Sequence, residues 1–200
     1  MTDRDVTIRN AAQDDAKAFS ELLFMSSSFL VSLFGSSESA ALANMFRRRK
    51  NLFSHEHTKI AEIDGKIAGM LLSYGYRAKT SQEAATGFQL CLEMGFDIVS
   101  KLTLFIRSGR LMDFVVEGDY YISNIAVFPE FRGRGIASKL IAEGEQSAKS
   151  EDARRLVLDT ETDHEDAIRL YGKLGFEVVK KDYIDLDERK YFFRMSKKVD

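Results

Sequence analysis

The sequence predicts a single α/β domain with a mixed sheet, and three observations support that prediction. Its 200 residues fit one domain, and a hydrophobic fraction of 44% is enough for a sizeable core. Segments with strand-like alternation are interspersed with segments whose apolar residues recur every three or four positions, as in α/β proteins. With only one proline, Pro129, a rigid linker is not indicated, so residues 1–200 are expected to form one domain.

Composition excludes several function classes. The net charge of −2, from 29 basic and 31 acidic residues, gives no reason to expect a partner nucleic acid or an anionic membrane. A single cysteine, Cys91, permits no intramolecular disulfide and favours a reducing compartment. The polar start and the absence of a long apolar run predict neither a signal peptide nor a membrane span. The expected location is the cytoplasm.

The N-terminal quarter predicts one strand and two helices. Residues 6–9 alternate apolar and polar, and Gln13-Asp14-Asp15 puts acidic residues in a first helical turn, where the helix dipole favours them. A second helix over 37–50 ends on Arg47-Arg48-Arg49-Lys50, which is interpreted as a solvated helix terminus rather than an anion site. The expected apolar stripes are Phe19, Leu22, Leu23 and Met25, then Leu42, Met45 and Phe46.

A hairpin and a helical insertion are predicted next. Asp64-Gly65 joins the apolar runs 58–63 and 67–76, and such a pair readily adopts the positive φ angles of a tight hairpin turn. Residues 81–116 predict one or two amphipathic helices, in which Cys91 is expected to be buried. The apolar residues of this insertion must cover the sheet or a second subunit: Phe88, Leu92, Phe96, Val99, Leu102, Phe105 and Ile106.

The C-terminal half predicts alternating strands and helices. Strands are expected at 120–127, 155–159, 177–179 and 191–195, with helices at 135–150 and 164–174. Simple alternation along the first of these strands puts Tyr121, Ser123 and Ile125 on one face, and Tyr120, Ile122 and Asn124 on the other.

The loop after strand 120–127 carries the clearest functional signal. Gly133 and Gly135 lead directly into a helix, so backbone N–H groups and the positive end of the helix dipole converge on one point. This arrangement is suited to a pyrophosphate, with Arg132 and Arg134 at its rim. One alternative is a tight connection without a ligand. Another is a dinucleotide site, but the spacer 128–132 and the short chain disfavour it.

Two linked motifs resemble the GNAT (GCN5-related N-acetyltransferase) superfamily. Arg132-x-x-Gly135-x-Ala137 matches its Q/R-x-x-G-x-G/A signature, and residues 167–176 look like its A-x-x-L-Y-x-x-x-G-F motif. The resemblance is sharp over 120–180 and does not cover 81–116. It implies a mostly antiparallel sheet that splits in a V beside the motif strand, with helices on its flanks.

The resemblance also implies a cofactor and its contacts. Acetyl-CoA would be the co-substrate, and no metal is implied. Tyr171 occupies the position of an acid that protonates the leaving thiolate, and His164 stands where relatives usually have asparagine, as a cofactor contact or a base. The implied cofactor-binding residues are Ile125, Ala126, Val127, Arg132, Gly133, Arg134, Gly135, Ile136, Ala137, Ser138, His164 and Tyr171.

The implied activity is transfer of acetyl to a primary amine by direct attack on the thioester. The identity of the acceptor stays open: it is either a small molecule or an amine of a protein or peptide. The oligomeric state, monomer or homodimer, also stays open. The insertion 81–116 is expected to shape the acceptor site. A non-catalytic acyl-CoA sensor or interaction module is the alternative. The base candidates are Glu117, Asp119, Tyr121, Ser123, Glu161 and Asp163, near an acidic cluster that also includes Asp159, Glu165 and Asp166.

Overall fold

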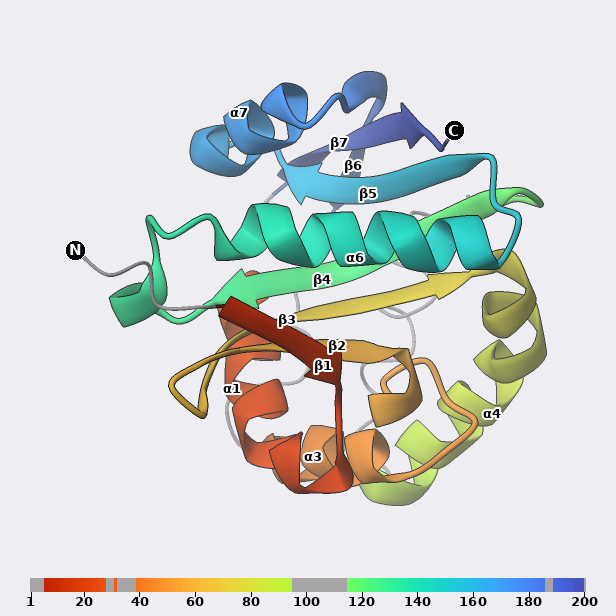
Figure 1. Ribbon diagram of the computed structural model, residues 1–200. Helices are drawn as coiled ribbons and strands as arrows, with labels where there is room; N and C mark the ends of the chain where they lie inside the picture. The colour runs from red at the N-terminus through yellow and green to blue at the C-terminus, as the bar shows by residue number, and fades with distance from the viewer. Residues whose placement is uncertain (1–5, 28–30, 32–38, 95–114, 186–188, 200) are drawn as a thin grey trace.

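Seven strands form one sheet in the computed structural model, which describes residues 6–27, 31, 39–94, 115–185 and 189–199 (Figure 1). Their order across the sheet is β1-β2-β3-β4-β5-β7-β6, and each neighbouring pair is antiparallel except β4 and β5. The mixed, mostly antiparallel sheet is confirmed. The strands are β1 (Val6–Asn10), β2 (Thr58–Ile63), β3 (Lys66–Gly75), β4 (Asp119–Val127), β5 (Arg155–Glu161), β6 (Glu177–Asp185) and β7 (Arg189–Lys198).

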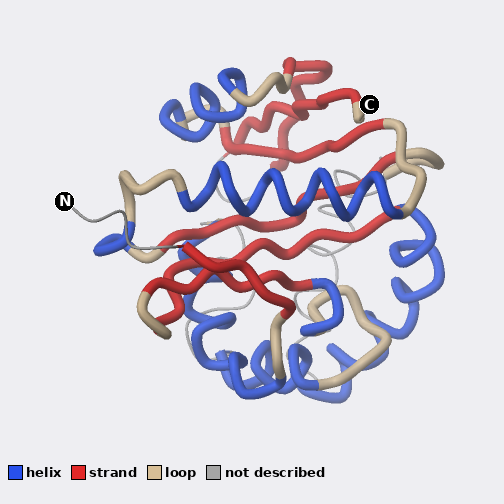
Figure 2. The backbone as a smooth tube through the Cα atoms, in the orientation of Figure 1, coloured by secondary structure: helices blue, strands red, loops and turns tan. Residues whose placement is uncertain are grey.

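Helices cover both faces of this sheet (Figures 1 and 2). Phe19, Phe46 and Met70 belong to the apolar core on one face, and Leu71 and Leu140 to the core on the other. Among the described residues, no helix is long and apolar enough to cross a bilayer. The first face carries α1 (Ala16–Ser26), α3 (Ser39–Arg47) and α4 (Tyr76–Met94); the second carries α6 (Ile136–Ser150) and α7 (Glu165–Lys173).

The predicted hairpin is confirmed in β2 and β3. Asp64 has a φ of 51° and Gly65 a φ of 71°, and the two residues between the strands turn the chain in the way that an Asp-Gly pair permits. β3 ends at Gly75, one residue earlier than predicted, because α4 begins at Tyr76.

The predicted N-terminal helix begins after a half-buried ion pair, in which Asp15 is buried and Arg9 is partly exposed. Asp14 and Asp15 lie in a short 3₁₀ turn before α1. The Arg9 guanidinium donates to both Asp15 carboxylate oxygens, at 2.7 and 2.9 Å, and the Ala12 N–H donates to the same carboxylate at 2.7 Å. Burial alone would raise the pKa of Asp15, but these hydrogen bonds hold that pKa below its usual value.

We therefore expect Asp15→Asn to lower the free energy of unfolding by about 2 kcal/mol at pH 7. Because the pKa of Asp15 is lower in the folded protein, its contribution is complete above about pH 5 and is lost as the pH falls through the folded pKa. Urea unfolding of both proteins at pH 7 and near pH 3 measures this difference. An equal difference at both pH values would contradict the assignment.

The parallel pairing of β4 with β5 is short. It runs from Asp119 opposite Arg155 to Ile122 opposite Leu158, and within the described residues it stops there. Beyond this point β4 continues to pair with β3 on its other edge, and β5 continues to pair with β7. The two strands therefore diverge, which confirms the implied V-shaped split.

A β-bulge in β4 corrects the predicted alternation. Leu72 lies opposite Asn124, whereas the next residue of β3, Ser73, lies opposite Ile122, so Ser123 is the extra residue. Tyr121 packs in a cluster with Tyr74 and Val157, near α4.

Beyond the bulge, each side chain of β4 lies on the opposite face of the sheet from the one that simple alternation predicts. Ile125 packs in the cluster on the α6 face, whereas Tyr121 lies on the α4 face. Placing Tyr121, Ser123 and Ile125 on one face was therefore wrong, because the bulge shifts the side-chain phase by one residue.

Only the first part of the predicted insertion 81–116 is described at length, as the C-terminal part of α4. This helix packs inward through Thr86, Leu90 and Met94, which turns Phe88 and Leu92 outward with 66% and 61% of their surface exposed. Cys91 lies on that outward side and is exposed, so its predicted burial was wrong. Residues 95–114, including Phe96, Val99, Leu102, Phe105 and Ile106, lie outside the described residues.

Candidate functional site

The glycine-rich turn connects the splayed end of β4 to α6 (Figure 1). A 3₁₀ turn at Pro129–Phe131 leads into Gly133 and Gly135, whose φ angles are 75° and 72°. A Cβ atom added at either glycine would meet nothing within 4 Å. The left-handed backbone explains why glycine suits both positions, and the space beside them is open to a ligand.

The start of α6 presents unpaired backbone donors. The N–H of Lys139 donates to the Gly135 carbonyl at 3.1 Å and begins the helical hydrogen bonds, so the preceding N–H groups lie outside the helical pattern. No side chain caps this helix end. The N–H groups of Gly135, Ile136, Ala137 and Ser138 and the helix dipole fit an anion such as the pyrophosphate of coenzyme A.

Two arginines border the turn. The Arg132 Nε donates to the Val127 carbonyl at 3.2 Å, and one Arg134 Nη donates to the Glu130 carbonyl at 3.4 Å. The Arg134 guanidinium also lies 5.7 Å from the centre of the Phe131 ring. Both guanidinium groups therefore fold onto their own loop and add positive charge at the rim of the turn.

The strand end before the turn offers a backbone edge. Ile125, Ala126 and Val127 are half-buried and pair with β3 along one edge. Their other edge faces the side from which β5 has diverged. An extended arm with amide groups, such as pantetheine, fits such an edge because it can pair with the backbone like a strand.

Tyr171 lies on α7 inside the same apolar cluster as Ile125 and Ile136. Its side chain is 8% exposed, and its ring centre lies 5.9 Å from that of Phe176. Burial raises the pKa of Tyr171 to about 12. The hydroxyl therefore stays protonated at neutral pH, as a proton donor must.

His164 is the residue before α7 and is exposed. The Glu161, Asp163 and His164 side chains offer ligand atoms within 4.8 Å of one another. However, Glu161 forms an ion pair with Lys190 at 3.4 Å, and exposed acidic groups are common without a metal. We propose no metal site here.

Two of the four acidic base candidates, Asp119 and Glu161, have basic partners. Asp119 receives hydrogen bonds from Arg155 at 2.9 Å and from the Val116 N–H at 3.1 Å. Arg169 forms ion pairs with Glu165 and Asp166. Part of the acidic cluster is thus paired with basic side chains, which weakens its expected attraction for a cationic amine.

The structure brings together three side chains that the sequence did not link. The Tyr121 hydroxyl donates to Asp159 at 3.1 Å, and Arg194 donates to both Asp159 carboxylate oxygens at 3.0 and 2.7 Å. Arg194 comes from the last strand, and sequence reasoning did not single it out. Burial, followed by the nearby Asp159 carboxylate, raises the pKa of Tyr121 well above its usual value, which argues against Tyr121 as a base.

A second network holds the bulge. The Ser123 hydroxyl donates to the Asn124 side-chain oxygen at 2.9 Å, and the Asn124 amide donates to the Ser26 hydroxyl at 2.7 Å. Ser26 in turn donates to the Leu23 carbonyl at 2.6 Å. These bonds tie β4 to the end of α1, and no local sequence signal linked residues this far apart in the chain.

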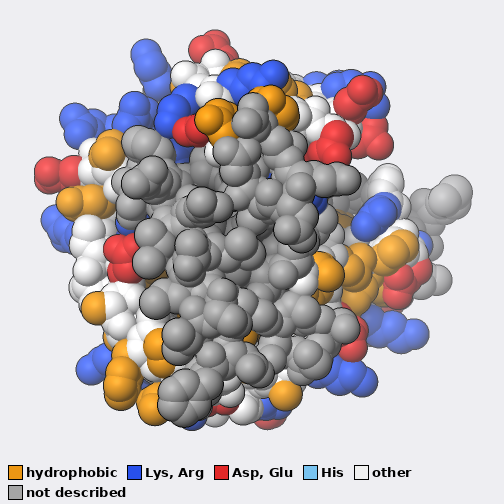
Figure 3. Space-filling view, turned by 180° about the vertical axis from the view of Figure 1, so that it is seen from behind, with side chains coloured by type: hydrophobic (Ala, Val, Ile, Leu, Met, Phe, Trp, Pro, Cys, Tyr) orange, Lys and Arg blue, Asp and Glu red, His pale blue; other side chains and the backbone are white. Residues whose placement is uncertain are grey.

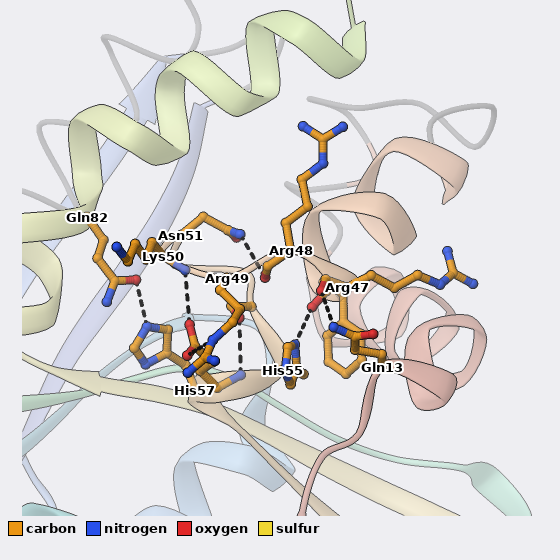
Figure 4. A network of polar contacts seen from close by, with 12 residues as sticks. Gln13, Arg47, Arg48, Arg49, Lys50, Asn51, His55, His57 and Gln82 are labelled. Atoms are coloured by element: carbon orange, nitrogen blue, oxygen red, sulfur yellow. Dashed lines mark hydrogen bonds and ion pairs between the residues drawn. The ribbon is translucent and has the colours of Figure 1, made fainter.

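The basic run at the end of α3 is partly neutralised (Figure 4). Arg48 lies 2.5 Å from Glu93, and Arg49 lies 2.6 Å from Glu56. The Arg47 carbonyl accepts a hydrogen bond from the Gln13 side chain at 3.1 Å. These contacts agree with the interpretation of the run as a helix terminus rather than an anion site.

The neighbouring histidines hold local structure. His55 Nδ1 lies 3.0 Å from the Phe46 carbonyl, and His57 Nε2 lies 2.9 Å from the Gln82 side-chain oxygen (Figure 4).

On the face shown in Figure 3, described basic and acidic side chains both occur around the margin. This mixture agrees with the nearly balanced charge of the chain.

The chain matches one protein-family model and several curated proteins. A family model described as "Acetyltransferase (GNAT) family" matches residues 25–176. N-alpha-acetyltransferase 30 of Schizosaccharomyces pombe is 41% identical over 63 residues, 32% of this chain and 42% of the relative. A putative [ribosomal protein bS18]-alanine N-acetyltransferase of Bacillus subtilis is 35% identical over 71 residues, 34% of this chain and 47% of the relative. Each alignment thus spans less than half of these relatives.

Solved structures share the fold over nearly the whole chain. An N-acetyltransferase from Staphylococcus aureus Mu50 has a TM-score of 0.68 at 22% identity, covering 95% of this chain and 99% of that one. The ribosomal-protein-S18-alanine N-acetyltransferase from Escherichia coli has a TM-score of 0.59 at 17% identity, covering 98% and 94%. At these identities the likeness shows the fold alone.

Proposed function

The chain belongs to the GNAT family of acetyltransferases, and from that premise we propose that it transfers acetyl from acetyl-CoA to a primary amine. One observation supports this proposal most directly. The parallel pairing of β4 with β5 ends at Ile122, and the freed end of β4 leads through two left-handed glycines into an uncapped helix. The free strand edge at Ile125, Ala126 and Val127 is thus followed along the chain by the backbone N–H groups of residues 132–138, which we call the anion cradle.

In the proposed complex, the pantetheine arm lies along Ile125, Ala126 and Val127. The pyrophosphate lies on the N–H groups between Arg132 and Ser138, with both arginines of the turn at the rim. These residues fit the cofactor because amide groups pair with a strand edge and phosphates favour a helix N-terminus. The thioester then lies between the diverging strands.

The chemistry needs a nucleophilic amine and a proton for the leaving group. The amine nitrogen attacks the thioester carbonyl, the C–S bond breaks, and the CoA thiolate takes a proton. Tyr171 is the proposed acid, since its hydroxyl is protonated far above neutral pH. His164 is exposed beside the start of α7 and is proposed to contact the cofactor or to accept the proton of the amine.

We infer that the acceptor is the α-amine of a protein or peptide. The matched relatives include proteins named N-alpha-acetyltransferase and ribosomal-protein alanine N-acetyltransferase. An α-amine also has a pKa of about 8, against about 10 for lysine, so more of it is the neutral nucleophile near neutral pH. Such an acceptor demands less of a base, which suits a site where Asp119, Asp159 and Glu161 are already paired with basic side chains.

Acetyl-CoA is expected to stabilise the folded protein. At about 100 times its dissociation constant a ligand adds about 2.7 kcal/mol, which corresponds to a rise in melting temperature of roughly 5–10 °C for a chain of this size. Scanning calorimetry with and without acetyl-CoA measures this shift, and desulfo-CoA without the thioester tests whether the coenzyme part suffices. An unchanged melting curve at millimolar acetyl-CoA would contradict the proposed cofactor.

Turnover is tested separately by following free CoA thiol. The substrates are tetrapeptides that begin with alanine, serine or methionine, and an N-terminally blocked peptide whose only amine is a lysine. We expect thiol release with the free α-amines and little with the blocked peptide. Tight binding of acetyl-CoA without release for any amine would favour the alternative of a non-catalytic sensor.

A further inference from the structure

Three side chains from three strands meet where β4 and β5 separate. The Tyr121 hydroxyl donates a hydrogen bond to Asp159, and the Arg194 guanidinium donates to both oxygens of the same carboxylate. The cluster is mostly buried, since Tyr121 is 5% exposed and Arg194 is 8% exposed, but it is not sealed, because 15% of the Asp159 side chain remains exposed. Exposed ion pairs are loosely held, but this cluster has fixed geometry because packing and hydrogen bonds restrain each member.

Its position coincides with the end of the parallel pairing. Tyr121 lies opposite Val157, and Asp159 is the first residue of β5 beyond the last pair with β4. Asp159 and Arg194 are direct partners across β5 and β7. The Tyr121–Asp159 hydrogen bond thus joins the strands just where they begin to diverge.

The cluster lies on the side opposite the proposed cofactor cradle. Tyr121 packs with Tyr74 and Val157, whereas α6 covers the other face of the sheet. If the pyrophosphate lies at the start of α6, a thioester between the strands is reached by the amine from the Tyr121 side. This step rests on the proposed function.

The direction of the hydrogen bonds determines what Tyr121 can offer. A phenol has one proton, and that proton points to Asp159, so the remaining lone pairs of the oxygen can only accept a hydrogen bond. Arg194 donates to both oxygens of the Asp159 side chain and has no lone pair to offer, so Asp159 is the acceptor toward which the phenol proton is directed. The raised pKa of Tyr121 agrees with a phenol that stays neutral.

We propose that Asp159 and Arg194 are positioning residues, which hold the Tyr121 hydroxyl as the hydrogen-bond acceptor for an N–H of the incoming amine. Binding one N–H at Tyr121 orients the amine so that its lone pair faces the thioester carbonyl. No proton moves to Tyr121 in this step. The Asp159–Arg194 pair has no net charge, so the cluster adds no net electrostatic attraction for an ammonium ion.

The first test is Tyr121→Phe, assayed with the alanine-leading tetrapeptide and acetyl-CoA varied in turn. One hydrogen bond lost from the bound peptide is expected to raise the peptide KM about tenfold. The acetyl-CoA dissociation constant is expected to stay nearly unchanged, whereas loss of the buried hydrogen bond to Asp159 is expected to lower the melting temperature by a few degrees. Tyr120→Phe is the matched control, because Tyr120 is equally buried but lies on the α6 face.

The second test asks whether Asp159 and Arg194 act through Tyr121. Asp159→Asn and Arg194→Lys are each expected to raise the peptide KM several-fold, yet to add little further in the Tyr121→Phe background. Both variants are expected to lower the melting temperature, but a cluster that serves only to stabilise the sheet would leave the peptide KM unchanged. Fully multiplicative effects on the peptide KM would also overturn the proposal.

The outcomes separate this inference from the proposed function. Wild-type protein that releases no thiol with any peptide overturns both. Wild-type turnover together with an unchanged peptide KM in Tyr121→Phe overturns the role of Tyr121 alone. If Tyr121→Phe fails to fold, Asp159→Asn and Arg194→Lys decide the matter, because unchanged peptide KM values in both would exclude positioning by this cluster.

Discussion

Gly135→Val is expected to abolish binding of acetyl-CoA while the protein still folds. The space beside Gly135 is open in the free protein, so the valine side chain meets no neighbouring atom within 4 Å at its Cβ. It would instead project into the volume that we assign to the pyrophosphate. The positive φ of 72° adds a strain of about 1–2 kcal/mol, which lowers stability but does not remove the sheet or its core.

Gly65→Val is a well-matched control for that experiment. Gly65 has a φ of 71°, and a Cβ there also meets nothing within 4 Å, but it lies in the β2–β3 hairpin turn. Both variants should therefore lose similar stability, and only Gly135→Val should lose acetyl-CoA affinity in isothermal titration calorimetry. Retained affinity in folded Gly135→Val would show that the glycine turn is not the cradle.

Tyr171→Phe is expected to lower kcat by about 10²- to 10⁴-fold, the range typical of general acid catalysis. Phenylalanine keeps the ring that packs near Phe176, so the fold and the affinity for acetyl-CoA should survive. Steady-state kinetics and acetyl-CoA titration together measure both quantities. Tyr120→Phe removes a hydroxyl from another buried tyrosine of the same apolar cluster and should leave kcat near the wild-type value.

The pH dependence supplies a further check on Tyr171. A pKa of about 12 keeps the hydroxyl protonated up to that pH, so kcat should show no loss from tyrosine ionisation below about pH 11. A wild-type rate in Tyr171→Phe would leave Tyr171 as a packing residue. In that case the leaving thiolate must take its proton from another group or from water.

Local rules predicted much of the fold, including the glycine-rich turn between a strand and a helix. The Asp64-Gly65 hairpin follows from residues adjacent in the sequence, because the turn type dictates the residue type. The turn through Gly133 and Gly135 was likewise predicted from its neighbours, although its left-handed φ angles were not. The apolar stripes of α1 and α3 were read from a helical period, and Leu22 and Phe46 are buried as expected. Met25 is the exception, since 42% of its surface is exposed.

The predictions that were wrong concern features that depend on contacts between residues distant in the chain. The bulge at Ser123 arises from pairing with β3, so alternation within β4 alone could not reveal it. Cys91 shares a helix with apolar residues, but the inward face of α4 was decided by α3. The last two strands were predicted at 177–179 and 191–195 and are longer, because lysines and other charged residues continue the pairing of β6 with β7.

The strand order also bears on how this protein is synthesised. β6 precedes β7 in the chain but reaches the sheet only through β7, which lies between β5 and β6. On the ribosome, β5 and β6 emerge before the strand that joins them, and their contacts must wait for residues 189–198. Arg194 belongs to that late strand, so Asp159 acquires its basic partner in the closing stage of folding. Nascent chains should therefore complete the cofactor-binding turn before they complete the Tyr121 cluster.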